Sequence, residues 1–183
     1  MTRRFRWEAI VARCPNEKII RGAEVGVWNG KNAEQLLRLL PLLCLTLVDR
    51  WAPPTSNDAY YKSGSKIARQ SYEEHKQAYF EAIERTKFAS DRIDIRISDT
   101  AQAALEYADG MFDFVFIDGD HSHEGCYRDI VAWAPKVKPG GFIGGHDYDH
   151  PAQGDVKGAV LRYFGGEDGI EIDVNRTWFR EME

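Results

Sequence analysis

The stretch DFVFIDGDH, Asp113–His121, decides the fold. Its apolar run at 114–117 shows no alternation, which is typical of a strand covered by helices on both faces of a parallel sheet. The carboxylates of Asp118 and Asp120 and the imidazole of His121 follow this run directly. Because open α/β sheets bind ligands beyond the carboxyl ends of their strands, we predict that the chemistry lies at this junction.

A second apolar segment ends in the same way. Phe142–Gly145 is followed at once by His146 and Asp147. If the two segments are neighbouring parallel strands, their carboxyl ends meet at one edge of the sheet, and oxygen and nitrogen donors from both could face one crevice. We interpret that crevice as the active site.

Extended and helical patterns alternate along the chain, which predicts an α/β fold with right-handed crossovers. The expected strands are 23–27, 44–48, 93–97, 112–117 and 142–145. The expected helices are 5–14, 33–40, 72–88, 100–108, 124–137 and 155–164, and a long loop with Tyr60 and Tyr61 fills 51–71. Two further strands, 170–174 and 177–182, read as a closing hairpin. We therefore predict a single domain, 1–183, with one doubly wound, mostly parallel sheet and an antiparallel C-terminal hairpin.

Composition narrows the function classes. A chain of 183 residues with a formal net charge of -5 and no Lys/Arg-rich block argues against nucleic acid as the main partner. No continuous apolar region indicates a secretory signal or a membrane span, so we expect a cytoplasmic protein without a membrane partner. The three cysteines lack paired spacing, and we expect them to be small buried hydrophobic residues. The sequence shows no apolar stripe beyond those expected for the core, so it does not predict an oligomeric state.

The first expected strand leads into a glycine-containing turn, EVGVWNG, at 24–30. Gly26 would let a ligand approach the backbone, and Gly30 would let the next helix begin tightly, although any strand-to-helix turn can need glycine for steric reasons alone. The second strand adds Asp49 about twenty residues later, where nucleotide-binding sheets place an acceptor for ribose hydroxyls. Trp28 interrupts a full GxGxxG pattern, which favours a nucleoside without a pyrophosphate.

Asp99 and Thr100 follow the third expected strand. Their carboxylate and hydroxyl could meet an adenine edge, and capping of the following helix is an equally economical role.

Five segments together resemble a known family: EVGVWNGKNAEQLL, VDRW, ISDTAQAA, DFVFIDGDHSHEGCYRDI and WAPKVKPGGFIGGHDY. They look like the class I S-adenosylmethionine-dependent methyltransferases, which share a Rossmann-like fold. The match is to the bacterial branch with macrocin-type sugar O-methyltransferases and cephalosporin-biosynthesis methyltransferase-like proteins. The resemblance runs from about Ala23 to Tyr148, and the IDGDH and PGG-to-GHDY pieces are its most specific parts.

The resemblance implies roles for residues at the strand ends. Six of them would hold S-adenosylmethionine: Glu24, Gly26 and Gly30 on its methionine side, Asp49 at the ribose, Asp99 and Thr100 at the adenine. Asp118 is assigned both to the cofactor site and, with His146 and Asp147, to a divalent metal such as Mg²⁺ or Mn²⁺. Catechol-type relatives carry an Asp-Asn pair where this chain has His146-Asp147.

His121 would be the general base, because a basic residue three positions after the metal-binding aspartate recurs in the catechol-type and sugar-modifying relatives. The implied reaction moves a methyl group to a hydroxyl of a small molecule, a sugar or another secondary metabolite. A metal would stabilise the alkoxide while an imidazole removes the proton.

Two other functions stay open at this point. The run Asp118–His123 could bind zinc through His121 and His123 in a metal-dependent hydrolase. A non-catalytic module could bind the nucleoside without turnover. A ribose acceptor at Asp49 argues against the hydrolase, and a base at His121 argues against the pure binder.

Overall fold

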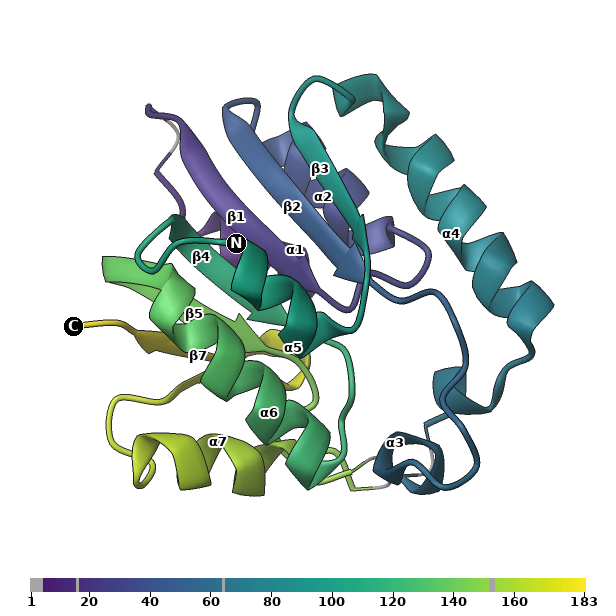
Figure 1. The fold of residues 1–183 in the computed structure, drawn as a ribbon. Coiled ribbons are helices and arrows are strands. Elements are labelled where there is room, and N and C mark those ends of the chain that lie inside the picture. Colours follow the sequence, from purple (N-terminus) through teal and green to yellow (C-terminus); the bar gives the residue numbers. More distant parts are fainter. Residues whose placement is uncertain (1–4, 16, 64, 152–153) are drawn as a thin grey trace.

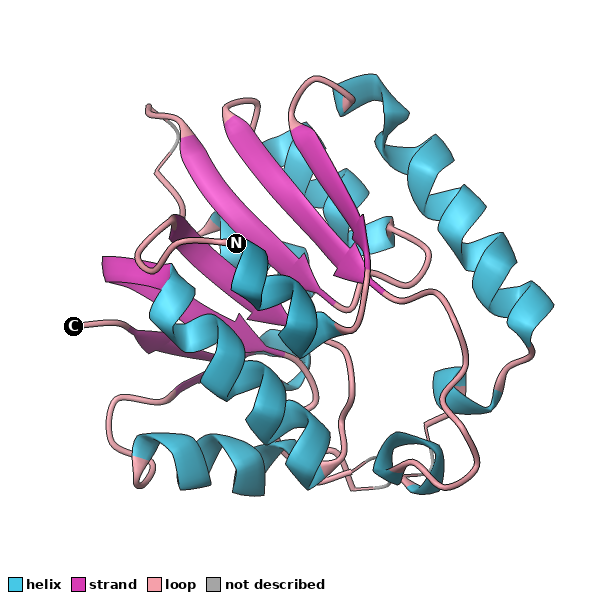
Figure 2. Cartoon of the chain, viewed as in Figure 1, coloured by secondary structure: helices cyan, strands magenta, loops and turns pink. Residues whose placement is uncertain are grey.

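A single sheet organises the molecule in the computed structural model, which describes residues 5–15, 17–63, 65–151 and 154–183 (Figures 1 and 2). Within these residues the strand order is β3-β2-β1-β4-β5-β7-β6. The bounds are β1 Ile20–Val25, β2 Leu43–Asp49, β3 Ile93–Ile97, β4 Phe112–Ile117, β5 Val137–Gly145, β6 Glu171–Asp173 and β7 Thr177–Glu181. The first five strands are parallel to one another, and β7 pairs antiparallel with both β5 and β6. The predicted fold class is thus confirmed.

Helices cover both faces of the sheet (Figure 1). One buried cluster joins the sheet to α1 Arg6–Val11, α2 Lys31–Leu39 and α4 Tyr72–Thr86. The other joins it to α5 Thr100–Ala103, α6 His123–Trp133 and α7 Val156–Phe164. This double covering explains why the central strands are continuously apolar.

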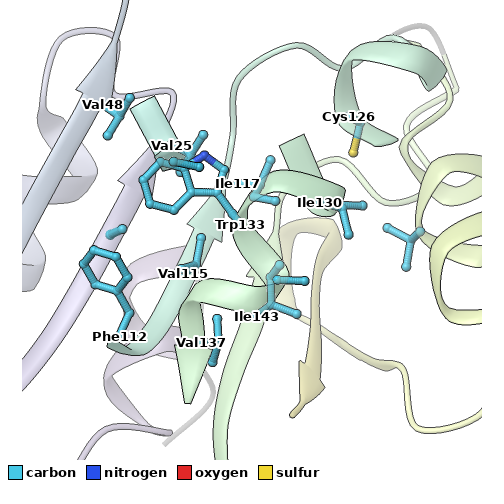
Figure 3. Close-up of a cluster of buried hydrophobic side chains, with 14 of the residues drawn as sticks. Val25, Val48, Phe112, Val115, Ile117, Cys126, Ile130, Trp133, Val137 and Ile143 are labelled. Atoms are coloured by element: carbon cyan, nitrogen blue, oxygen red, sulfur yellow. The ribbon is translucent and has the colours of Figure 1, made fainter. Parts of the chain in front are cut away.

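Strand β4 divides its side chains between the two clusters. Phe114 and Phe116 belong to the α1–α2–α4 side, and Val115 and Ile117 belong to the α5–α6–α7 side, because successive residues of a strand point to opposite faces. Figure 3 shows Val115 and Ile117 packed with Trp133 of α6. The apolar core therefore fixes the end of β4, and with it the position of Asp118.

The sheet topology puts the chemistry-bearing strand ends side by side. β1 lies between β2 and β4, and β4 pairs with β5, in the register Ile117 to Gly145. Strand β3, in which Asp94 and Arg96 alternate with apolar residues, is an edge strand, and such alternation is typical of strands that are not covered on both faces. Residues after β1, β2, β3, β4 and β5 consequently meet along one edge of the sheet.

Two expectations about local structure are wrong. Strand β5 begins at Val137 rather than Phe142, because a register irregularity between Phe112 and Phe114 lets the Lys138–Gly141 segment continue the strand. The expected long loop at 51–71 contains the short helices α3, Ala59–Lys62, and Ile67–Arg69.

The expectation for the cysteines holds in part. Cys14 and Cys126 are buried and all three cysteines are free, but Cys44 is exposed. In the part of the chain described, every helix is too short or too polar to cross a lipid bilayer.

Candidate functional site

The turn after β1 is shaped by backbone conformations that favour glycine. Gly26 has φ +91°, and a Cβ there would lie 2.4 Å from the carbonyl oxygen of Asp118. Gly30 has φ +74° at the N-cap of α2, where a Cβ would lie 2.7 Å from Cα of Ala82. Trp28 takes a left-handed conformation as well, with φ 52°, although it carries a side chain. The turn therefore brings the backbone of β1 and β4 into close contact.

Asp49 fastens this turn to the end of β2. Its Oδ2 accepts hydrogen bonds from the backbone N–H groups of Val27 and Trp28, both at 2.9 Å, and its Oδ1 accepts one from Trp51 at 2.8 Å. The Trp51 indole donates to the carbonyl of Trp28 at 2.7 Å. The carboxylate thus has a structural role, and it also lines a cavity.

Asp99 and Thr100 begin α5. The Asp99 carboxylate accepts a hydrogen bond from the backbone N–H of Gln102 at 3.1 Å, so it caps the helix as the alternative reading expected. The Thr100 hydroxyl donates to Asp129 at 2.6 Å. Asp129 is fully buried, and burial raises its pKa to about 7.

A cavity of about 300 Å³ lies across these strand ends, a size within the range of roughly 300–1,000 Å³ typical of small-ligand sites. We call it the Asp49 cavity. Five predicted cofactor residues line it: Gly26, Asp49, Asp99, Thr100 and Asp118. Glu24 and Gly30 do not line it.

Glu24 lies beneath the turn. Its side chain is 1% exposed, and its Oε1 accepts a hydrogen bond from the Asn32 amide at 3.3 Å. Burial raises the pKa of Glu24 to about 8. A direct contact of Glu24 with a cofactor stays a prediction, because in this arrangement the carboxyl supports the turn from inside.

Four side chains from the ends of β4 and β5 form a compact cluster. The Asp118 Oδ1 atom lies 3.3 Å from His121 Nε2 and 3.5 Å from His146 Nδ1. The Asp147 carboxylate completes the ring, with Oδ1 3.1 Å from His146 Nδ1 and Oδ2 3.3 Å from His121 Nδ1. The two strand ends therefore do converge, as the two motifs predicted.

A fifth charged group joins this cluster from the start of the chain. The Arg6 Nη1 atom lies 2.5 Å from Asp118 Oδ2. Sequence analysis did not include Arg6 among the site residues. The only feature of the sequence that marks Arg6 is the basic run RRFR at 3–6, which does not follow an expected strand.

The charged groups of the cluster shift one another's pKa values. Burial alone would raise the pKa of Asp118, but the charge of Arg6 and the hydrogen bonds from His121 and His146 hold it far below its ordinary value. Burial alone would lower the pKa of His146, but its bonds to Asp118 and Asp147 raise it to about 9. The pKa of His121 is raised in the same way, since Asp118 and Asp147 outweigh the burial.

The cluster opens into a second cavity of about 640 Å³, which we call the His121 cavity. Its walls include Arg6, His121, His146 and Asp147. Sequence reasoning did not assign to the site the polar residues that surround them: Asn29, Lys31, Asn32, Ser65, Asn175 and Arg176. The first three belong to the EVGVWNGKNAEQLL segment, where the glycines and Glu24 were the residues singled out, and the other three belong to no quoted motif.

The predicted metal ligands meet but do not form a metal site. Among the described residues, no three His, Cys, Asp or Glu side chains are arranged to hold a metal ion. The oxygens of Asp118 are paired with the guanidinium of Arg6 and the imidazoles of His121 and His146, and those of Asp147 are paired with the same two imidazoles. The residues present thus do not fit the divalent metal that the resemblance implies.

His123, the second ligand of the hydrolase alternative, points away from the cluster. Its Nδ1 lies 2.8 Å from Asp155 Oδ2, and it lines neither cavity. Asp120 accepts a hydrogen bond from the backbone N–H of Ser122 at 2.8 Å, next to the N-cap of α6. The pairing of His121 and His123 that a zinc hydrolase would need is absent from the described residues.

Comparison with known proteins places this arrangement in context. A family described as "Methyltransferase domain" matches residues 23–148. The O-methyltransferase NovP has a similar structure, with a TM-score of 0.71 at 16% identity, over 97% of this chain and 79% of that one. A putative caffeoyl-CoA O-methyltransferase from Staphylococcus aureus has a TM-score of 0.64 at 11% identity, over 98% of this chain and 83% of that one. A SAM dependent methyltransferase from Aquifex aeolicus has a TM-score of 0.57 at 14% identity, over 96% of this chain and 87% of that one.

No curated protein matches the chain. The structural similarities are at low identity and establish the fold. The family match covers more than half of the chain, and it spans the turn after β1 and the ends of β2 to β5 that line both cavities. The chain belongs to the methyltransferase domain family.

Proposed function

We propose that the chain transfers a methyl group from S-adenosylmethionine to a hydroxyl of a small molecule. The cofactor would lie in the Asp49 cavity, with its ribose at Asp49 and its adenine at Asp99 and Thr100. The acceptor would lie in the His121 cavity. The family match and the acidic strand ends around the first cavity support the donor, since a carboxylate such as Asp49 is the usual acceptor for ribose hydroxyls.

The observation that carries this proposal is the contact between the two cavities. Both are lined by Trp28, Tyr60, Ile67 and Asp118. A sulfonium methyl at the Asp118 end of the first cavity would face an oxygen in the second. In-line transfer needs the two reacting atoms about 3–3.5 Å apart, and adjoining cavities are the arrangement that achieves this.

His121 is suited to accept the proton of the acceptor hydroxyl. It lines the second cavity, its side chain is 13% exposed, and Asp118 and Asp147 flank both ring nitrogens. An alcohol is a poor nucleophile until it loses its proton. As the carbon–oxygen bond forms, the proton passes to His121 and the carbon–sulfur bond breaks to leave a neutral sulfide.

The lining of the His121 cavity favours a hydroxyl-rich acceptor. Amide and hydroxyl side chains surround it, and each can donate to or accept from a sugar-like hydroxyl: Asn29, Asn32, Ser65 and Asn175. We therefore propose a sugar or another polar secondary metabolite as the acceptor class.

The first test is calorimetric titration of the purified chain with S-adenosylmethionine and with S-adenosylhomocysteine. We expect binding of both in the micromolar range. Absence of binding to both would overturn the proposal. Release of S-adenosylhomocysteine with a panel of sugars, catechols and alcohols then tests turnover, and binding without turnover on any of them would favour the non-catalytic module.

A further inference from the structure

The first turn of α1 brings a positive charge into the His121 cavity. Arg6 begins this helix, and its Nη1 approaches the Asp118 carboxylate to 2.5 Å. The arginine side chain is 26% exposed and that of the carboxylate 11%. This ion pair is therefore mostly buried, and both of its residues line the His121 cavity.

Helix α1 is held firmly enough to position this charge. Ala9 and Ile10 are fully buried against the α2 side of the sheet. Two residues after the helix ends, Arg13 binds Asp173 and Glu171 of β6, each at 2.8 Å. Arg6 thus belongs to a helix whose apolar face is buried and whose following segment is held by two ion pairs.

The arginine takes up a position that a metal ion would need. A divalent cation binds through free carboxylate lone pairs at about 2.0–2.6 Å. In Asp118, Oδ2 faces Arg6 and Oδ1 faces His121 and His146. A cation arriving here would have to displace a guanidinium that is already paired, and like charges would repel it.

We propose that the guanidinium of Arg6 stands in place of the divalent cation, so that this chain binds its acceptor beside a positive charge of its own. The inference rests on the proposed function, because it assigns Arg6 to the acceptor side of the same site. A guanidinium keeps its charge throughout the physiological pH range. It can stabilise the negative charge that develops on the acceptor oxygen as His121 takes the proton.

Manganese binding measured by electron paramagnetic resonance tests this inference without any acceptor. Bound Mn²⁺ loses the signal of the hydrated ion. We expect no specific binding by the wild-type chain, with or without saturating S-adenosylhomocysteine. The Arg6→Gln variant exposes the Asp118 oxygen, and we expect its Mn²⁺ affinity to rise by at least about tenfold. Arg6→Lys keeps the positive charge and should stay close to wild type.

Two controls make the result specific to this site. Arg13→Gln removes an arginine just beyond the end of α1 but leaves Asp118 paired, so its Mn²⁺ binding should match that of the wild type. The double variant Arg6→Gln/Asp118→Asn should lose the gained affinity. Stoichiometric Mn²⁺ binding by the wild type that Asp118→Asn abolishes would overturn the inference, and so would a folded Arg6→Gln variant with no gain.

Nucleoside binding in the same samples separates the two proposals. S-adenosylhomocysteine affinity should be similar in the wild type, Arg6→Gln and Arg6→Lys, because Arg6 does not line the Asp49 cavity. If none of the three binds the nucleoside, the proposed function fails whatever the manganese result. If all three bind it and the wild type also binds manganese through Asp118, the role of Arg6 alone is refuted.

Discussion

The carboxylate of Asp49, at the end of β2, accepts a 2.9 Å hydrogen bond from the backbone N–H of Trp28 in the turn after β1. The same Oδ2 atom also accepts from Val27. Asp49 thus holds the backbone that faces the cavity, and it presents its carboxylate to the same cavity. Any substitution here tests both roles at once.

Asp49→Ala should weaken the binding of S-adenosylmethionine about a hundredfold, or by roughly 3 kcal/mol. The substitution removes the acceptor for the ribose hydroxyls and leaves two backbone N–H groups without their partner. Calorimetric titration of wild type and variant measures the difference.

Asp49→Asn is the matched control, because it keeps one acceptor oxygen for the turn but loses the negative charge. It should bind the cofactor with an affinity between those of the wild type and Asp49→Ala. Equal affinity in all three chains would remove Asp49 from the cofactor site.

His121→Gln should abolish methyl transfer and leave S-adenosylhomocysteine affinity nearly unchanged. The imidazole lines the His121 cavity but not the Asp49 cavity, so its loss removes the base and spares the nucleoside contacts. Single-turnover assays with an acceptor found in the panel give the rate, and calorimetry gives the affinity. Turnover at the wild-type rate would show that another group takes the proton.

The pH dependence of kcat/KM gives an independent check on His121. A general base works in its unprotonated form, and Asp118 and Asp147 raise the pKa of this imidazole above its ordinary value of 6.5. The rate should therefore rise with pH, with a midpoint above 6.5. A midpoint below that value, or a rate that is flat from pH 6 to 9, would contradict the assignment.

The fold could be predicted from sequence because its signals are local. Unalternating apolar runs mark β2 and β4, the Asp94 and Arg96 alternation marks edge strand β3, and glycine turns mark the crossovers. Since parallel strands align their carboxyl ends, convergence of Asp118 with His146 and Asp147 followed from two motifs about 28 residues apart.

Arg6 could not be predicted in the same way. It contacts Asp118 because α1 packs on the sheet beside α2, and no spacing rule links a residue at the start of the chain to a strand end over a hundred residues later. Sequence gave no sign that a cation from the chain would meet the predicted metal ligands.

Glu24→Gln should stabilise the chain increasingly as the pH rises. The pKa of Glu24 is about 8 in the folded chain and 4.5 ordinarily, so the folded state holds this proton more tightly. The stability that the protonated Glu24 carboxyl contributes to the wild-type chain is complete below pH 4.5 and is lost as the pH rises through 8. Glutamine does not titrate and can still accept the bond from Asn32.

The measurement is urea denaturation of both chains at pH 5 and pH 7.5. The stability difference in favour of Glu24→Gln should grow by a few kcal/mol between these values, since one pKa unit corresponds to about 1.4 kcal/mol. A difference that does not change with pH would mean that the carboxyl is already ionised in the folded chain.

Gly26→Ala should damage both stability and cofactor binding, and Gly165→Ala isolates the part due to backbone strain. Both glycines have positive φ, +91° and +77°, so alanine costs on the order of 1 kcal/mol at either position.

A Cβ at Gly165 meets nothing within 4 Å, whereas one at Gly26 meets the Asp118 backbone at 2.4 Å. Gly26→Ala must therefore push the ends of β1 and β4 apart, with a larger loss of stability in urea denaturation and a weaker affinity for S-adenosylhomocysteine. Equal effects of the two substitutions on both readouts would show that the close approach of β1 to β4 does not shape the cavity.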